Sequence, residues 1–167
     1  MGKTTTLDKA ARFSKSLQKN GKTIGLVVGS FDILHLGHIN LFRYAKKHVD
    51  ILIVGLDNDQ TIKLVKGKNR PINNLQRRSD FLSDLKTIDL IFEIKTVSHN
   101  NSEQALEDYK KIVTKISPTH IFTHSICDRH WQKKKKIASE NNIIFLLDRS
   151  KKITNSGEII QKLSTEL

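Results

Sequence analysis

Two histidines early in the chain have the residue type and the spacing to act on one ligand. The stretch GSFDILHLGH, residues 29–38, contains His35 and His38, separated by a leucine and a glycine. In a helix that begins here, residues three apart lie on one side of the first turn, so both imidazoles can donate hydrogen bonds to the same phosphate. The alternative is a chance pair of surface or core histidines, because short motifs have many false positives.

The elements on either side of this pair place it at a strand end. Residues 23–29, TIGLVVG, are short, apolar and rich in β-branched residues, which predicts a buried strand, and residues 36–48 predict a helix with one apolar face. Where a strand leads into a helix, free N–H groups and the helix dipole favour anions. Residues 29–31 are expected to form the turn, and Gly37 is expected to let a ligand approach the backbone.

The rest of the chain repeats this alternation. Further strands are predicted at residues 50–56, 89–94, 120–124 and 143–147. Further helices are predicted at residues 74–86, 102–116, 129–140 and 155–163, with an N-terminal helical extension in residues 1–20. Five strands alternating with helices predict an α/β fold with a five-stranded parallel sheet in one domain, residues 1–167. Ligands of such sheets bind beyond the carboxyl ends of the strands.

Composition limits the classes of protein that fit. The 167 residues are 37% hydrophobic, as expected for one globular domain with a core. No apolar run approaches the roughly 20 residues of a membrane span, and residues 1–13 lack the apolar stretch of a signal peptide. The single cysteine, Cys127, favours a reducing, cytoplasmic setting. No membrane partner is therefore expected.

The net charge of +12 calls for an anionic partner. Nucleic acid, anionic membranes and small phosphorylated ligands are the usual candidates. Residues 133–136, four consecutive lysines, are expected to form a solvated helix face, and aromatic residues make up only 6% of the chain, which gives little support for a base-stacking surface. Small phosphorylated ligands are favoured, and a nucleic-acid-binding module is the alternative from another class.

Three separated blocks resemble one family, the cytidylyltransferase-like nucleotidyltransferases. Residues 29–38 match its pattern of a glycine, a small residue, Phe-Asp and H-x-G-H. Residues 66–73, KGKNRPIN, followed by Arg78 and Asp89, are similar to the adenylyltransferase domain of bifunctional ADP-heptose synthases. Residues 149–156, RSKKITNS, resemble the Arg-Thr-Glu-Gly-Ile-Ser-Thr-Thr signature of glycerol-3-phosphate cytidylyltransferases.

The resemblance implies a Rossmann-like three-layer sandwich and a reaction in which an acceptor phosphate attacks the α-phosphorus of a nucleoside triphosphate and pyrophosphate leaves. It implies catalytic roles for His35, His38 and Lys66, the lysine coming from the loop after the second predicted strand. The nucleotide contacts that it implies are Gly29, Ser30, Phe31, Asp32, Gly37, Arg78, Arg149, Thr154 and Ser156. The implied cofactor is Mg²⁺, held mainly by the triphosphate, and the family often forms homodimers.

Several of these residues have plainer explanations. Lys66 lies in a lysine-rich stretch and could be an ordinary solvated lysine. Arg78 could pair with Asp80 or Asp84 on its own helix. Three others could act only on the protein's own backbone, as caps of a turn or of a helix: Asp32, Thr154 and Ser156.

One segment departs from the family and leaves the substrates open. Residues 123–131, THSICDRHW, stand where heptose adenylyltransferases carry Lys-Gly-Gly-Asp-Tyr and glycerol-3-phosphate cytidylyltransferases carry Gly-Asp-Asp-Trp. Residues 151–152 are two lysines in place of the usual Glu-Gly. ATP with a sugar phosphate is favoured by the second block. CTP with glycerol 3-phosphate or a similar alcohol phosphate, transfer to flavin mononucleotide, and a non-catalytic nucleotide sensor are the alternatives.

The divergent segment also contains residue types that could form a metal site. His124, Cys127, Asp128 and His130 are all residue types that bind metals. Their spacing fits no standard zinc pattern, so no protein-held metal is expected there.

Overall fold

The computed structural model describes residues 3–98, 102–126, 128–151 and 154–165, which form an all-parallel six-stranded sheet in the order β1-β4-β3-β2-β5-β6. The strands are β1 (Thr4–Thr5), β2 (Ile24–Gly29), β3 (Ile51–Asp57), β4 (Leu90–Ile94), β5 (His120–His124) and β6 (Ile144–Asp148). The helices are α1 (Leu7–Lys19), α2 (Leu36–Lys46), α3 (Asp59–Lys66), α4 (Leu75–Ser83), α5 (Glu103–Ile116), α6 (Trp131–Glu140) and α7 (Ser156–Thr165).

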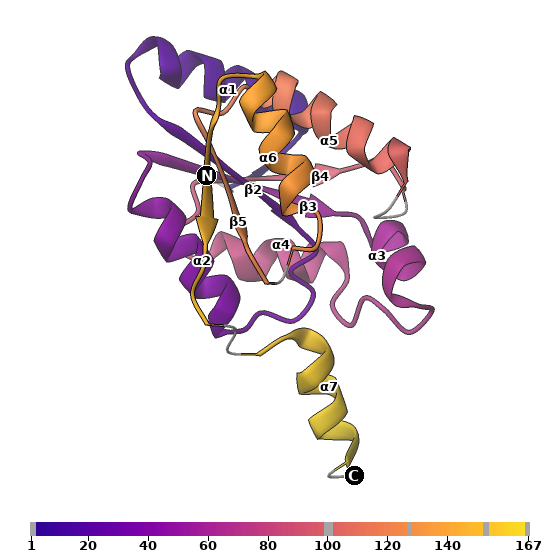
Figure 1. The fold of residues 1–167 in the computed structure, drawn as a ribbon. Helices are drawn as coiled ribbons and strands as arrows, with labels where there is room; N and C mark the ends of the chain where they lie inside the picture. The colour runs from indigo at the N-terminus through magenta and orange to yellow at the C-terminus, as the bar shows by residue number, and fades with distance from the viewer. Residues whose placement is uncertain (1–2, 99–101, 127, 152–153, 166–167) are drawn as a thin grey trace.

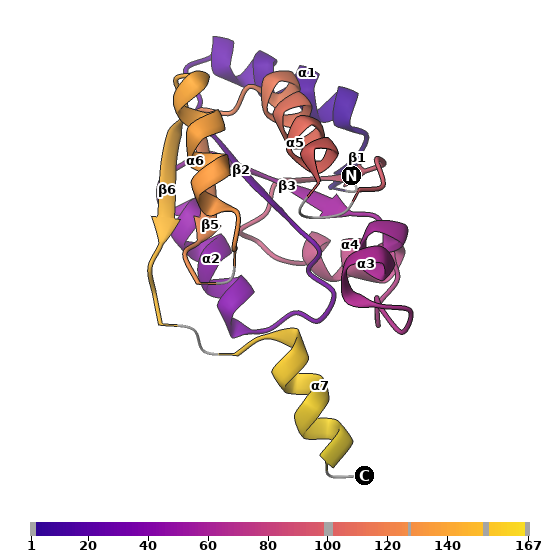
Figure 2. The same ribbon diagram turned by 45° about the vertical axis from the view of Figure 1, so that its right-hand side comes forward.

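Helices cover both faces of the sheet. α1, α5 and α6 lie on one face, and α2 and α4 lie on the other (Figures 1 and 2). On each face, one apolar cluster fills the space between the sheet and its helices. The first cluster includes Ala10 and Ile112, and the second includes Phe42 and Leu82. Each of these four residues is at most 5% exposed, so both layers have a closed core. The three-layer sandwich expected from the alternation and from the family resemblance is confirmed.

The strand order creates a crevice at the carboxyl edge of the sheet. From β2 the chain proceeds to β3 and β4 on one side, and it then crosses to β5 and β6 on the other side. The reversal lies between β2 and β5, which is where doubly wound sheets bind ligands. The segment between β2 and α2, which carries the histidine pair, therefore starts at the reversal point.

Two elements were not predicted from the sequence. β1 is only two residues long and pairs with β4 at the sheet edge, in the register Thr4↔Ile91. α3 lies in the segment expected to be a loop, so Lys66 ends a helix. Asn58 caps α3 by accepting a hydrogen bond from the Thr61 N–H at 2.8 Å. The cap residue Asn58, the acidic Asp59 in the first turn and the apolar Ile62 and Val65 are a local helix signal that could have predicted α3.

The C-terminal helix stands apart from these layers. α7 leads away from the sheet, beyond the start of α2 (Figures 1 and 2). Within the described ranges, no helix is long and apolar enough to cross a membrane.

Candidate active site

The turn after β2 is built around Phe31. Its backbone has a φ of 45°, a left-handed conformation that is uncommon outside glycine, and its side chain is 5% exposed. The ring folds back over Gly29, where a Cβ atom would lie 3.0 Å from the ring. The same ring meets His38 edge-on, with centroids 5.1 Å apart. Gly29 and Phe31 thus act as packing partners that fix the position of His38.

The two imidazoles lie face to face at the start of α2. Their centroids are 3.8 Å apart and their planes differ by 25°. The Nδ1 atoms of His35 and His38 are both buried, and neither has a hydrogen-bond partner among the described residues. Because buried polar atoms are nearly always paired, two adjacent unpaired nitrogens are unusual and mark this pair as a candidate functional site.

Gly37 makes room for this stacking. A Cβ atom at position 37 would lie 3.1 Å from both Cε1 and Nδ1 of His35. The sequence suggested that this glycine admits a ligand to the backbone. The structure shows a more direct reason for a glycine at position 37, because any larger residue would press on the His35 ring.

Burial keeps both histidines neutral in the free protein. Burial, together with smaller contributions from the nearby His35 and Lys66, lowers the pKa of His38 to about 3. It also lowers the pKa of His35, where the Glu158 carboxylate opposes the shift and Lys66 adds to it. Each neutral imidazole keeps one N–H donor that an incoming anion can accept from.

Lys66 reaches across to the same turn. Its Nζ donates a hydrogen bond to the Ser30 hydroxyl at 2.7 Å, although 36 residues separate them. Burial and the Arg70 guanidinium lower the pKa of Lys66, while the carboxylates of Asp32 and Asp57 oppose this shift. The structure thus brings a cation from α3 beside the turn that leads to the histidines, as the sequence blocks implied.

Arg78 lies beneath this turn rather than in open space. Its side chain is fully buried, and Nη1 donates to the Ser30 carbonyl at 2.6 Å. Nη2 donates to the Asp57 carbonyl and to the Asp59 carboxylate, each at 2.8 Å, and Nε donates to the Asn73 carbonyl at 3.0 Å. The expected pairing with an acidic residue of its own helix is wrong, because Asp59 of α3 is the ion-pair partner. This geometry disfavours direct contact with a nucleotide and makes Arg78 a positioning residue.

Asp32 also acts on the protein itself. Its carboxylate is 1% exposed, forms an ion pair with Arg70, and accepts from Arg70 Nε at 2.6 Å. It accepts a second hydrogen bond from the Asn73 N–H at 2.9 Å, while the Asn73 side-chain amide donates to the Asp32 carbonyl at 2.7 Å. These bonds attach the segment after α3 to the histidine turn. Of the two roles that the sequence allowed for Asp32, contact with a nucleotide or contact with the protein itself, the structure shows the second.

The start of α7 approaches the turn from the other side. The Ser156 hydroxyl donates to the Ile33 carbonyl at 3.5 Å, and the Thr154 carbonyl lies 4.0 Å from the position of a Cβ on Gly37. Both residues therefore lie near the histidine turn. Arg149 is exposed directly after β6, between Asp148 and Ser150.

Asn155, rather than Thr154 or Ser156, caps this helix. Its Oδ1 accepts from the Glu158 N–H at 2.9 Å, and its amide donates to the Glu158 carboxylate at 2.7 Å. Asn155 thus acts as an N-cap residue for the Glu158 N–H, and its side-chain amide adds a second bond to the same glutamate. The interpretation of Thr154 or Ser156 as the cap is therefore wrong, and the Ser156 hydroxyl remains beside the site.

The divergent segment after β5 is held together by its own polar groups. Asp128 accepts from the Thr123 hydroxyl at 2.6 Å and from Lys134 at 2.7 Å. The Lys134 ammonium also lies 5.2 Å from the centre of the Tyr109 ring. His124 is buried and accepts from the Ile126 N–H at 3.1 Å. Cys127 lies outside the described residues, and among those described no three His, Cys, Asp or Glu side chains are grouped to hold a metal ion.

Sequence reasoning missed two further residues at this edge. Asp57 is the last residue of β3, and burial raises its pKa, although Lys134, Lys66 and Arg78 oppose the shift. Arg70 belongs to the second sequence block, but its type and position did not reveal that it would bind Asp32. The parallel register of β2 and β3 pairs Gly29 with Leu56, so Asp57, the next residue of β3, lies beside the start of the histidine turn. This register is known only from the structure.

A doubly wound sheet with two imidazoles and a lysine beside its strand reversal is typical of α/β proteins that bind phosphates. A family model described as cytidylyltransferase-like matches residues 26–161. The chain belongs to this cytidylyltransferase-like family, and it is an enzyme of the nucleotidyltransferase type. The family inferred from the three sequence blocks is confirmed.

Curated relatives with the printed name "Bifunctional protein HldE" match part of the chain. The protein of Hyphomonas neptunium is 49% identical over 78 residues, which are 46% of this chain and 16% of the relative. That of Desulfatibacillum aliphaticivorans is 33% identical over 118 residues, 68% of this chain and 24% of the relative. The chain therefore spans no more than a quarter of these relatives.

Solved structures show the same fold. A lipopolysaccharide core biosynthesis protein from Thermoplasma volcanium has a TM-score of 0.58 and 25% identity, covering 79% of this chain and 99% of that one. A pantoate-beta-alanine ligase from Francisella tularensis has a TM-score of 0.68 and 18% identity, covering 100% of this chain and 79% of that one. The second likeness is one of fold alone.

Proposed function

We propose that the protein transfers AMP from ATP to a small phosphorylated sugar and releases pyrophosphate. The observation that carries this proposal is the pair of buried, unpaired Nδ1 atoms on His35 and His38, with Lys66 beside the same turn. The choice of a sugar phosphate is supported by the second sequence block, which resembles ADP-heptose synthases, and by the printed names of the relatives.

The chemistry needs positioning and positive charge more than a base. An oxygen of the acceptor phosphate forms a bond to the α-phosphorus, and the bond from that phosphorus to the bridging oxygen breaks. Pyrophosphate leaves with the electron pair of that bond. Because the acceptor phosphate is already an anion at neutral pH, no group has to remove a proton from it. Donors that meet the transferring phosphate as its charge builds up supply the rate enhancement.

The site residues divide between two tasks in this proposal. His35 and His38 donate hydrogen bonds to the α-phosphate, and Lys66 exchanges Ser30 for a phosphate oxygen. The backbone of residues 29–31 and of Gly37 borders the nucleotide. Arg149, directly after β6, and Thr154 and Ser156, at the start of α7, hold the β- and γ-phosphates. Asp32 and Arg78 hold this machinery in place from beneath.

The donor set fits a nucleotide that brings its own Mg²⁺. Three carboxylates at this edge are already engaged by cations, namely Asp32 by Arg70, Asp59 by Arg78 and Asp128 by Lys134. A triphosphate supplies most ligands of Mg²⁺ itself, and the ion keeps several waters, so few protein ligands are needed. When bound, the ion neutralises part of the triphosphate charge. We place the reaction in the cytoplasm, where nucleoside triphosphates are available.

A second candidate uses CTP and glycerol 3-phosphate or a similar alcohol phosphate. It is favoured by residues 149–156, which resemble the glycerol-3-phosphate cytidylyltransferase signature. Both candidates use the same histidines and differ in the base and the acceptor.

Pyrophosphate release with Mg²⁺ separates these candidates. ATP and CTP are each combined with heptose 1-phosphate, glycerol 3-phosphate, phosphocholine and flavin mononucleotide. We expect release with ATP and heptose 1-phosphate, and release slower by about 10²–10³ when His38→Ala replaces the wild type. Release only with CTP would favour the second candidate. A protein that binds a nucleotide but releases nothing with any acceptor would contradict the proposed transfer to these acceptors.

A further inference from the structure

β6 is an edge strand with an open outer side. It pairs only with β5, and in Figure 2 it lies at the margin of the molecule. Its sequence is IFLLD, and the Ile144 side chain is 53% exposed. Natural proteins usually protect a free edge with lysine, proline or a bulge, because the edge invites pairing with another chain. β6 contains neither lysine nor proline, and its register with β5 is continuous.

The opposite edge of the sheet is protected. β1 is two residues long, consists of two threonines and follows directly after Lys3. The Thr4 hydroxyl is also engaged, at 2.7 Å from the Ser79 hydroxyl of α4. A strand this short and polar offers little backbone for pairing. The two edges therefore differ, and β6 is the one suited to accept another strand.

The backbone groups of β6 point alternately toward β5 and toward the free edge. The Ile144 N–H donates to the Thr119 carbonyl at 3.0 Å. At the other end of the strand, the Asp148 carbonyl accepts from the Ser125 N–H at 2.9 Å. Both end residues of β6 therefore direct their hydrogen-bonding groups toward β5, as does every second residue between them.

Phe145 and Leu147 direct their N–H and C=O groups to the outside. In the part of the chain that the structure describes, no backbone group bonds to them there. Their spacing of two residues is the spacing that an antiparallel pair needs, because in such a pair every second residue exchanges both of its hydrogen bonds with one residue opposite. The edge thus offers donors and acceptors in a regular array.

We propose that β6 pairs with β6 of a second copy of this chain, antiparallel and about a two-fold axis at Leu146. Phe145 then exchanges hydrogen bonds with Leu147 of the partner subunit, and Leu147 exchanges them with Phe145 of the partner subunit. The arrangement is self-complementary, as a two-fold interface must be. It joins the two six-stranded sheets into one. The family resemblance implies homodimers without a surface, and this pairing assigns one.

Side chains on both faces of β6 support the pairing. Phe145 packs against the apolar cluster under α1, α5 and α6, and Leu146 packs against the cluster on the other face. Neither side chain is fully buried in the single chain. A two-fold axis perpendicular to the sheet places like faces side by side, so Leu146 meets Leu146 of the partner subunit and Ile144 loses exposure to water.

The charge of α6 limits the strength of this dimer. α6 packs against β6, and its sequence contains four consecutive lysines. Lys134 is paired with Asp128 at 2.7 Å, but Lys133 and Lys135 have no ion-pair partner among the described residues. The proposed axis brings the α6 helices of both copies onto the same face, where these lysines repel each other. Because salt screens this repulsion, the dimer is expected to be tighter at high ionic strength.

Sedimentation velocity of the full chain at low and high NaCl tests this inference. The wild type is expected to dimerise at micromolar concentrations, and more tightly at high NaCl. Ile144→Lys adds a cation beside the axis in each copy and is expected to weaken the dimer by at least about tenfold.

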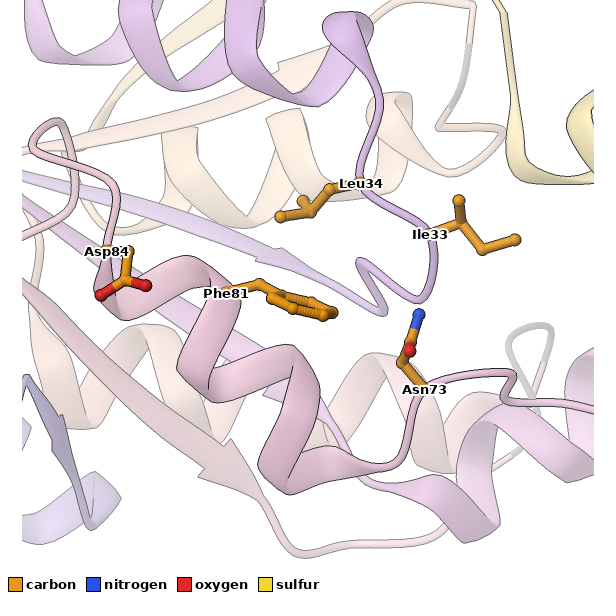
Figure 3. Close-up of a pocket in the computed structure, with 5 residues that line it drawn as sticks. All are labelled: Ile33, Leu34, Asn73, Phe81 and Asp84. Carbon is orange, nitrogen blue, oxygen red and sulfur yellow. The ribbon is translucent and has the colours of Figure 1, made fainter.

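Phe81→Lys is the matched control. The Phe81 side chain is 48% exposed on α4, in a pocket with Leu34 and Asp84 (Figure 3). This pocket is another apolar surface through which two copies could associate. The dimer is expected to be unchanged in Phe81→Lys, and its loss in this variant alone would assign the interface to the pocket and overturn the inference.

Leu147→Pro tests the backbone pairing itself. Proline removes the outward N–H and leaves the bonds to β5 intact, so the variant is expected to melt as a folded protein and to sediment as a monomer. Amide exchange of the wild type at residues 145 and 147 is expected to slow as the protein concentration rises, and this readout needs no substitution. A wild type that stays monomeric at millimolar concentration would overturn the inference. A dimer without slower exchange at these two residues, or one that Ile144→Lys retains in full, would overturn it as well.

Discussion

Arg78 and Ser30 are joined by a hydrogen bond of 2.6 Å from Nη1 to the Ser30 carbonyl, although 48 residues separate them. The same guanidinium holds the Asp57 carbonyl at the end of β3. One buried side chain thus connects the ends of two neighbouring strands at the point where the histidine turn begins. The stability of this edge and the position of Ser30, which Lys66 contacts, depend on it.

Arg78→Lys is expected to lower the free energy of unfolding by about 2–4 kcal/mol. Lysine keeps the charge but cannot replace a planar fork that bonds four acceptors, so several buried groups lose their partner. Urea unfolding measures the loss. Arg77→Lys, at the exposed neighbouring position, is the control and should change stability by less than about 0.5 kcal/mol. Equal effects of both substitutions would show that the bonds of Arg78 contribute little.

Lys66→Met is expected to lower kcat/KM by about 10²–10³ without a large loss of stability. The substitution keeps most of the apolar side-chain volume but removes the cation that lies beside the turn, 2.7 Å from the Ser30 hydroxyl. Lys63→Met, on the exposed surface of the same helix, should leave kcat/KM near that of the wild type. If kcat/KM falls equally in both variants, Lys66 contributes only to the overall positive charge of α3 and not through its position beside the turn.

Gly37→Ala is expected to reduce turnover at least tenfold while the protein stays folded. The new Cβ would lie 3.1 Å from the His35 ring and would force it out of the stack with His38. A small displacement of a catalytic group is costly in rate. Leu36→Ala, at the exposed neighbouring position, adds no atom near the ring and is the control. Wild-type turnover in Gly37→Ala would show that the stacked geometry is not required.

The depressed pKa of His38 predicts a loss of stability in mild acid. Its pKa is 6.5 in the unfolded chain and about 3 in the fold, so between these values the unfolded state binds more protons. The free energy of unfolding therefore falls as the pH drops below 6.5, and the contribution is absent above it. From pH 7 to pH 5 this amounts to about 2 kcal/mol.

Urea unfolding of the wild type and of His38→Gln at pH 7 and pH 5 measures this contribution. The wild type should lose more stability than the variant, because glutamine takes up no proton. Titration of the carboxylates is common to both proteins and cancels in the difference. Identical losses would mean that His38 is protonated as readily in the fold as in the unfolded chain.

Most of the sheet and its helices could be predicted because each element follows one strong rule. The β-branched apolar runs that end at Gly29 and His124 predict buried strands, and Ser102 predicts the start of α5, where it accepts from the Ala105 N–H. β1 could not be predicted in the same way, because a strand of two residues has no local pattern and depends on the pairing of Thr4 with Ile91. α3 was missed although Asn58 is a local cap signal at its start.

The sequence motif predicted where the candidate site lies, but it did not predict which residues face a ligand and which support the site from within. The spacing of His35 and His38 predicted that both rings would lie on one side of a helix start, and they do. Residue type could not show that Asp32 and Arg78 face inward, because their partners Arg70, Asn73 and Asp59 lie far along the chain.

A double-mutant cycle on the two histidines tests the central claim most directly. Initial rates of pyrophosphate release are measured for wild type, His35→Ala, His38→Ala and the double variant, with ATP, heptose 1-phosphate and Mg²⁺. If both rings serve one phosphate, each single substitution lowers kcat by about 10²–10³, and the double substitution costs much less than the product of the two. Single variants that keep wild-type turnover, or losses that multiply fully, would contradict joint action on one phosphate.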